Sequence, residues 1–266
     1  MEELRQKIWG ILETYTGHFG LVLMNQTTGA RLELNPTLPF PAASMIKVPI
    51  MYEIMRQAAA NTLSLEDTLI VTKEVCVGGA GILKELRPNL PMTVKELITL
   101  MIIVSDNTAT NMLIDLVGMK SINDTMAALG LTATCLKRRM MDFAAVQNGC
   151  ENTTSAADLA LLYSKLLTGS EIPMSYNHLM LDILKRQQIR DKLPFYWPEE
   201  TVLAHKTGTL AGVEHDGGIL FFPGGPYIVV VLTGNLDANY RGLQLVAEIG
   251  QVLYDHFNPM GYKEEL

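Results

Sequence analysis

Two groups able to do chemistry stand three residues apart in the apolar segment 40–50: the hydroxyl of Ser44 and the amine of Lys47. On a helix, this spacing places both side chains on one face. A serine hydroxyl is a weak nucleophile at neutral pH, and an amine can take its proton only where burial or a nearby cation lowers the pKa of the amine. The apolar neighbours could bury the pair and so suit attack on an acyl group. Alone, the spacing is weak evidence for a catalytic pair, since a capping serine and a solvated lysine give the same pattern.

Two further polar motifs follow along the chain. Ser105-Asp106-Asn107 stands between two predicted helices, and Lys206-Thr207-Gly208-Thr209 continues a predicted strand. Acyl transfer needs a nucleophile, a base, donors for the oxyanion, an acid for the leaving amine and a cation for an anionic substrate. The three motifs together contain these groups. Asp106, His205 and His215 are more simply read as structural residues, the first as a cap.

The elements around the first motif place its serine at a helix start. Three prolines at positions 36, 39 and 41 indicate an extended approach, and residues 45–60 have the length and composition of a buried helix. Unpaired backbone N–H groups at such a helix start suit an oxyanion.

The middle of the chain has helical patterns. A capping box at Thr93 and Glu96 opens an apolar helix, and further helices are predicted over 108–117, 121–129, 155–167 and 175–189. Residues 61–89 are irregular and are expected to form a loop with short helices and a flexible turn at 78–81, and residues 136–154 are expected to form a long surface loop.

Strand patterns occur at both ends of the chain. The N-terminal part predicts a helix at 3–15 and a hairpin over 19–34, and the C-terminal part predicts short strands from 202 to 233 and a closing helix at 243–257. We therefore expect one α+β domain over 1–266. Its antiparallel sheet would be built from both termini and flanked by helices, with residues 1–43 and 190–266 as an α/β lobe and 44–189 as an inserted all-α lobe. Ligands are expected in the cleft between the lobes.

Composition excludes several classes of function. A net charge of −7 argues against nucleic-acid binding, and three cysteines and five histidines without metal-ligand spacing predict neither a metal nor a disulfide framework. The apolar runs are too short for a membrane span, and the N-terminus shows no leader pattern. We expect a monomer that stays inside the cell, or is exported if a leader has been removed.

In their order, Ser44-x-x-Lys47, Ser105-Asp106-Asn107 and Lys206-Thr207-Gly208 form the motif set of class A β-lactamases and penicillin-binding proteins. The chain resembles this family over nearly its whole length, including Phe40-Pro41 and residues 153–157 and 247–250. The resemblance implies a β-lactamase/transpeptidase-like fold, no cofactor, and a β-lactam or a D-Ala-D-Ala-type peptide as the substrate.

The resemblance also implies a role for each motif. Ser44 would be the acyl-accepting nucleophile, Lys47 its proton partner and Ser105 the relay to the leaving nitrogen, while Asn107 would bind the substrate's side-chain amide. Lys206 and Thr207, with Thr209 nearby, would face a substrate carboxylate, and Gly208 would let the substrate backbone lie against its strand. The oxyanion hole would consist of the backbone N–H groups of Ser44 and Thr209.

Two departures from the family pattern concern the later steps. Class A β-lactamases carry a glutamate in an R-x-E-x-x-x-N loop that activates the deacylating water, but residues 138–148 contain no such glutamate. Asp142 is the nearest candidate base, and Glu151 is expected to be a solvated charge. The arginine that many members place on the neighbouring strand is also missing beside Glu214, so carboxylate binding would fall on Lys206 and Thr209.

The sequence therefore predicts a serine acyl-hydrolase that is acylated on Ser44 by β-lactams and hydrolyses the β-lactam amide slowly. Two alternatives stay open. One is a D-alanyl-D-alanine carboxypeptidase-like or esterase-like penicillin-binding protein, and the other is a β-lactam-binding or sensor domain that acylates without turnover.

Overall fold

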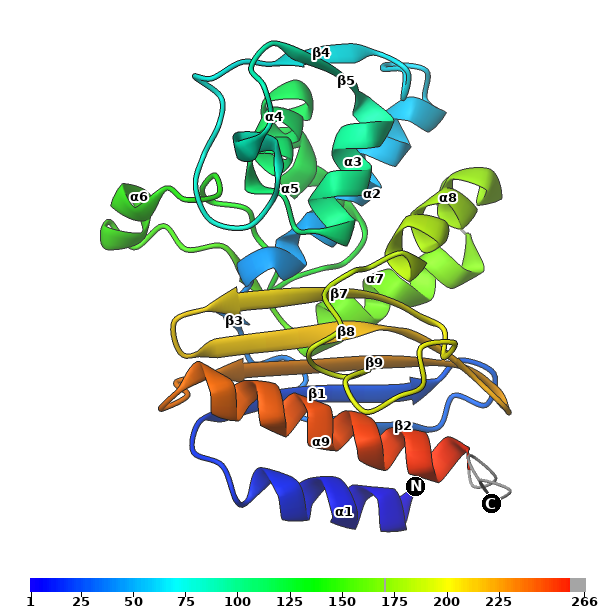
Figure 1. Ribbon diagram of the computed structural model, residues 1–266. Coiled ribbons are helices and arrows are strands. Elements are labelled where there is room, and N and C mark those ends of the chain that lie inside the picture. The colour runs from blue at the N-terminus through cyan, green and yellow to red at the C-terminus, as the bar shows by residue number, and fades with distance from the viewer. Residues whose placement is uncertain (170, 259–266) are drawn as a thin grey trace, which may run out of the picture.

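A five-stranded antiparallel sheet, in the order β2-β1-β9-β8-β7, forms the centre of the computed structural model, which describes residues 1–169 and 171–258. The N-terminal part supplies β1 (His18–Asn25) and β2 (Arg31–Leu34), and the C-terminal part supplies β7 (Leu203–Leu210), β8 (Val213–Phe222) and β9 (Gly225–Gly234). The predicted sheet shared by both ends of the chain is confirmed (Figure 1).

Each face of the sheet has its own hydrophobic core, because side chains alternate along the strands. Leu21 and Leu23 of β1 pack with helices α1 (Glu2–Leu12) and α9 (Asn239–Phe257), whereas Val22 and Met24 belong to the core on the other face. By the same alternation, Lys206 and Gly208 of β7 lie on that second face, and Thr207 and Thr209 lie on the α9 side.

The closing helix packs against the segment before β7 through a glycine. A Cβ at Gly250 would overlap the carbonyl oxygen of Leu193, and Trp197 Nε1 donates a hydrogen bond to Gly250 O at 2.9 Å. A larger residue at this position would push α9 away from residues 193–197.

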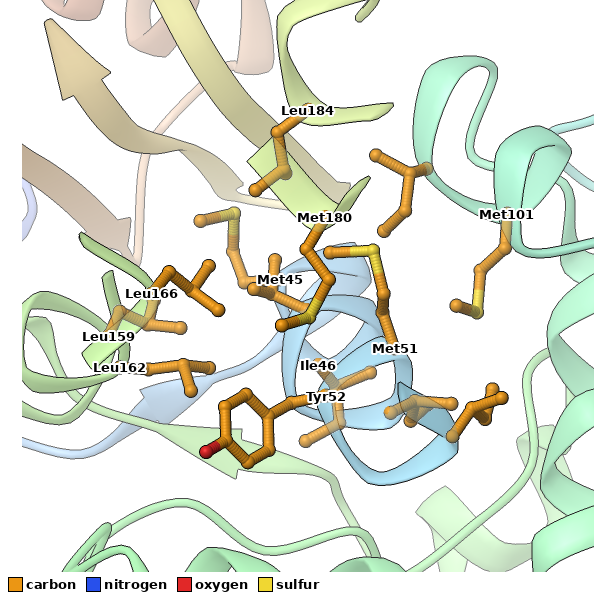
Figure 2. Packing of buried hydrophobic residues seen from close by; sticks show 14 of the residues in the cluster. Met45, Ile46, Met51, Tyr52, Met101, Leu159, Leu162, Leu166, Met180 and Leu184 are labelled. Carbon is orange, nitrogen blue, oxygen red and sulfur yellow. The ribbon is translucent and has the colours of Figure 1, made fainter. Parts of the chain in front are cut away.

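The second core is organised around helix α2 (Lys47–Ala59), which follows the 3₁₀ turn η1 (Ala43–Ile46). Figure 2 shows Met45, Ile46, Met51 and Tyr52 of this segment surrounded by side chains of the neighbouring helices, including Met101, Leu159 and Met180. The surrounding helices are α3 (Val94–Ile103), α4 (Asn107–Val117), α5 (Met119–Ala128), α7 (Ala156–Thr168) and α8 (Met174–Lys185). In Figure 1, α2 to α5 lie beyond the β7 edge of the sheet.

Short strands that the sequence did not predict, and one short helical turn within the predicted loop with short helices, brace this helical part. The irregular segment 61–89 contains β4 (Thr68–Val71), which pairs with β5 (Leu90–Thr93), and the turn η2 (Leu83–Glu85). The loop 136–154 contains α6 (Phe143–Gln147) and ends in β6 (Thr153–Thr154), which pairs with β3 (Phe40–Pro41). These pairings join segments far apart in sequence, so local patterns did not predict them.

As predicted, β7 continues through the Lys-Thr-Gly motif, and it ends at Leu210. Its motif residues are polar but buried, a combination that hydrophobic patterning does not detect. The capping box of Thr93 and Glu96 is confirmed. Within residues 1–169 and 171–258, no helix has the length and apolarity needed to cross a membrane.

Candidate active site

The nucleophile candidate lies in a 3₁₀ turn, directly before the main helix. The backbone N–H of Lys47 bonds to Ser44 O, and residues three apart are eclipsed in such a turn, so both side chains share one face. Ser44 is partly exposed, whereas Lys47 is fully buried. The predicted helix start is therefore correct, except that its first turn is 3₁₀ rather than α-helical.

Strand β7 passes close to the backbone of this turn. A Cβ at Gly208 would lie 3.1 Å from Ala43 Cβ and 3.3 Å from Ser44 N, so glycine keeps the strand against the nucleophile. Gly208 is expected to make room for a substrate, and its packing against this turn is a second reason for a glycine at this position. Ala43 itself has a φ of 46°, a strained value for a residue with a side chain, which bends the chain into the turn.

Three motifs meet at the hydroxyl of Ser105. Lys47 Nζ lies 2.9 Å and Lys206 Nζ 3.1 Å from Ser105 Oγ. Ser105 has a φ of 56° in the turn between α3 and α4, which places its side chain between the two amines. Because both amines donate to this oxygen, its own proton is left to donate elsewhere.

The remaining contacts of the two lysines are with neutral oxygens. Lys47 Nζ is 2.7 Å from Ser105 O and 2.9 Å from Asn107 Oδ1, and Lys206 Nζ is 2.8 Å from Thr207 O. Burial lowers the pKa of Lys47 to about 7, against an opposing effect of the nearby Asp106 charge. Burial, and then the proximity of Lys47, also hold the pKa of Lys206 well below its usual value. Lys47 can therefore act as a base near neutral pH.

Asp106 has the structural role predicted for it. Its carboxylate caps α4 by accepting from Ala109 N at 2.9 Å, and it also accepts from Ile82 N at 2.7 Å and Leu83 N at 2.9 Å. The predicted flexible turn at 78–81 is thus fastened to the second motif, and the backbone N–H of Asn107 bonds to Ala80 O.

The two histidines near β7 are structural as well. His205 Nδ1 lies 2.8 Å from Asp216 Oδ1, with both side chains fully buried. His215 Nε2 lies 2.8 Å from Pro41 O while its Nδ1 accepts from Thr233 N, an arrangement that suits the neutral ring. Burial lowers the pKa of His215 to about 4.

A cleft of about 160 Å³ opens above Ser44. Its lining residues, as far as the chain is described, are Ala43, Ser44, Gly79, Ala80, Asn107, Arg138, Met140, Met141, Phe143, Thr209 and Leu210. This set contains no carboxylate. Met140 stands two residues after Arg138, where the resemblance places the missing glutamate.

Asp142 has a structural role at the start of α6. It is exposed, and its side chain caps α6 by accepting from Ala145 N at 3.0 Å. It does not line the cleft, which argues against Asp142 as the base for deacylation.

The expectation that Glu151 is a solvated charge is wrong. Its Oε1 lies 2.7 Å from Nη2 of the buried Arg138, and this ion pair joins the two ends of the loop. Asn152 reinforces the junction by accepting from the backbone N–H groups of Lys137 and Arg138. Nothing in the local sequence distinguishes these partners from surface charges.

Sequence reasoning missed a polar cluster beside Thr209. The Thr209 hydroxyl donates to Glu214 Oε2 at 2.7 Å, and Lys192 Nζ lies 3.1 Å from the same carboxylate oxygen and 3.3 Å from Thr209 Oγ1. Asn239 Nδ2 donates to Glu214 Oε1 at 2.7 Å. Thr209 is therefore engaged inward, contrary to the expectation that it is free to bind a carboxylate. Lys192 lies in a segment with no pattern that could have marked it.

Comparison with protein families gives one match over almost the whole chain. The sequence model of the beta-lactamase enzyme family matches residues 3–257. Beta-lactamase VEB-1 of Pseudomonas aeruginosa is 22% identical, covering 96% of this chain and 91% of that protein. A beta-lactamase of Bacillus licheniformis is 25% identical, covering 97% of this chain and 85% of that protein.

A solved beta-lactamase and two solved PBP-A structures match this chain with similar TM-scores. A beta-lactamase from Sphaerobacter thermophilus has a TM-score of 0.89 and 31% identity, covering 97% of each chain. PBP-A has a TM-score of 0.87 and 30% identity, covering 97% of this chain and 96% of the other. A PBP-A mutant in an acyl-enzyme complex with penicillin G is also 30% identical, with a TM-score of 0.87 and 97% coverage of each chain.

Proposed function

This chain belongs to the beta-lactamase enzyme family and has its β-lactamase/transpeptidase-like fold, and from that premise we propose that it is a serine hydrolase that opens the β-lactam amide through an acyl-Ser44 intermediate. One observation carries the proposal: Lys47 and Lys206 converge on Ser105 Oγ beside the turn that holds Ser44. The nucleophile, its base and the cleft come from one chain, so a monomer would suffice.

Acylation uses groups that the Ser44 turn, the start of α2 and the Ser105 turn supply. Ser44 Oγ loses its proton to neutral Lys47 as it bonds to the carbonyl carbon, and the backbone N–H groups of Ser44 and Thr209 receive the oxyanion, each donor worth about 3 kcal/mol. The C–N bond then breaks, and the nitrogen takes the Ser105 proton, which Lys47 replaces across 2.9 Å.

The surroundings of Lys47 favour the proton transfer. Protonated Lys47 has three N–H groups, and three acceptors surround it, namely Ser105 O, Ser105 Oγ and Asn107 Oδ1. These three acceptors stabilise the ammonium that forms during the attack. They therefore lower the barrier to acylation instead of only strengthening substrate binding.

Deacylation is proposed to be the slow step. Water must add to the acyl carbon and return a proton to Ser44, and a carboxylate facing that carbon would normally activate it. The corresponding wall of this cleft presents Met140 and Met141, and Asp142 caps α6 instead.

The same wall favours a second candidate, a D-alanyl-D-alanine carboxypeptidase-like protein. Such a protein needs the acylation groups but no rapid attack of water on a penicilloyl group. A PBP-A mutant, at 30% identity, was solved as an acyl-enzyme complex with penicillin G, which is consistent with a site of this fold that holds an acyl group.

One experiment separates the candidates. The protein is mixed with a chromogenic cephalosporin, a fluorescent penicillin and a D-Ala-D-Ala peptide, while turnover and intact mass are followed. A stoichiometric adduct followed by slow cephalosporin turnover supports the β-lactamase, and peptide cleavage with a lasting adduct supports the carboxypeptidase. A folded sample that gives neither adduct nor turnover excludes both.

A further inference from the structure

Thr209 lies where the cleft meets the α9 side of the sheet, and its hydroxyl already makes hydrogen bonds within the protein. It lines the cleft, yet its proton goes to Glu214 Oε2 at 2.7 Å and one lone pair faces Lys192 Nζ at 3.3 Å. A hydroxyl has one proton and two lone pairs, so what remains for a ligand is a single lone pair. A carboxylate oxygen has no proton to offer to that lone pair.

The cation at this end of the cleft is also neutralised by carboxylates of the protein. The cation of Lys192 lies 3.1 Å from Glu214 Oε2 and 3.5 Å from Asp191 Oδ1. Lys192 and Glu214 are both nearly fully buried, and Asn239 holds the second oxygen of Glu214 at 2.7 Å. A negative charge fixed beside a cation removes the attraction that the cation would have for an anionic substrate.

Lys206, the other cation near this end, belongs to the Ser105 side of the strand. Lys206 Nζ makes its contacts with Ser105 Oγ at 3.1 Å and Thr207 O at 2.8 Å, on the opposite face of β7 from Thr209. The subsite at Thr209 is thus left with a hydrogen-bond acceptor and with a cation that Glu214 and Asp191 already neutralise.

We propose that Glu214 determines substrate specificity by making the Thr209 subsite one for an uncharged group, so that the enzyme accepts acyl donors whose carboxylate is blocked as an ester or a carboxamide. The inference rests on the proposed acylation of Ser44 and names the class of substrate that the site takes. A carboxamide N–H would donate to the free lone pair of Thr209, and an ester would avoid repulsion by Glu214.

Benzylpenicillin and its methyl ester test the proposal, with adduct formation on the full chain followed by intact mass. The wild-type protein is expected to react with the ester within about tenfold of its rate with the acid. In Glu214→Gln, the rate with the acid should rise about tenfold while the rate with the ester changes less than about twofold. Glu13→Gln, at an exposed position after α1, removes the same charge far from the cleft and should change neither rate.

The outcomes distinguish a failure of the proposed acylation of Ser44 from a failure of the proposed role of Glu214. If neither compound forms an adduct with the wild-type protein, the proposed function is refuted and the inference falls with it. If the acid forms an adduct more than about a hundredfold faster than the ester, or Glu214→Gln leaves the ratio of the two rates unchanged, acylation stands and the role of Glu214 is overturned. The wild-type ratio decides the matter even if Glu214→Gln does not fold.

Discussion

The two walls of the cleft are built in opposite ways. The polar wall (Ser44 at the surface of the cleft, with Lys47, Ser105 and Lys206 buried behind it) comes from helix starts, a tight turn and the edge strand β7, and its amines are hydrogen-bonded. The methionine wall (Met140, Met141 and Phe143) comes from a loop and the short helix α6, and neither it nor Arg138 beside it presents a carboxylate to the cleft. The contrast teaches that forming an acyl-enzyme and clearing it are served by separate parts of the fold, so one can be complete without the other.

The largest expected effect comes from removing the base of the polar wall. Lys47→Met should slow acylation by about 10³-fold, because Ser44 then has no partner to take its proton. The rate of adduct formation with a fluorescent penicillin measures this. Lys95→Met, on the exposed face of α3, is the matched control. An unchanged rate in Lys47→Met would show that another group is the base.

The second prediction gives the methionine wall the missing group. Met140→Glu places a carboxylate two residues after Arg138 and should speed deacylation by about 10²-fold, since it can activate water beside the acyl carbon. The decay of the adduct after excess penicillin is removed measures the step. Met174→Glu, at the exposed start of α8, is the control. Equal decay in both variants would mean that the wall does not limit deacylation.

The pH dependence of acylation tests the state of Lys47. Because its pKa is about 7, the amine is protonated at lower pH and the acylation rate should fall about tenfold per pH unit below 7. The unfolded chain keeps this proton up to about pH 10.4, so the free energy of unfolding should rise with pH between these values. A rate that is flat between pH 5.5 and about pH 8 would contradict a neutral-lysine base.

A smaller effect is expected where the loop is closed. Glu151→Gln leaves the buried Arg138 without its ion pair and should lower the free energy of unfolding by about 1–3 kcal/mol. Acylation should change little, because the polar wall does not depend on this junction. Denaturant unfolding measures the first quantity, with the exposed Glu85→Gln as control. A loss of acylation as large as that of Lys47→Met would show that acylation depends on both walls and would contradict their separation.

The smallest effect is predicted for Asp142→Asn. Asparagine caps a helix as well as aspartate does, so α6 should keep its stability. Deacylation should change less than about twofold, because the Asp142 carboxylate faces Ala145 N rather than the cleft. Adduct decay slowed tenfold or more would restore Asp142 as the base.

The sequence predicted the polar wall better than anything else in the molecule. Its groups are carried by three short motifs, and the order of the motifs along the chain, through the family resemblance, indicated one site; the structure brings Lys47, Ser105 and Lys206 together, while their catalytic roles stay a prediction. The shared sheet was predictable because its strands are short apolar runs bounded by turn residues. The boundaries of the two lobes at residues 43/44 and 189/190 stay a prediction, and residues 259–266 of the predicted α/β lobe lie outside the described part of the chain.

The ion pairs could not be predicted in the same way. Lys192, Glu214 and Asn239 come from a loop, a strand and a helix start, and Arg138 and Glu151 come from opposite ends of a loop. Each is a common surface residue type, and only the folded chain brings partners together and removes water from them. Burial of a charge is a tertiary property, so no local pattern reveals it.

The most direct test of the central claim is an intact-mass time course of the wild-type protein with benzylpenicillin, beside Ser44→Ala. One acyl group per chain should appear on Ser44 faster than it is lost, remain detectable after free penicillin is removed, and be absent from Ser44→Ala. Rapid turnover without an accumulating adduct, or an adduct that persists in Ser44→Ala, would contradict the account.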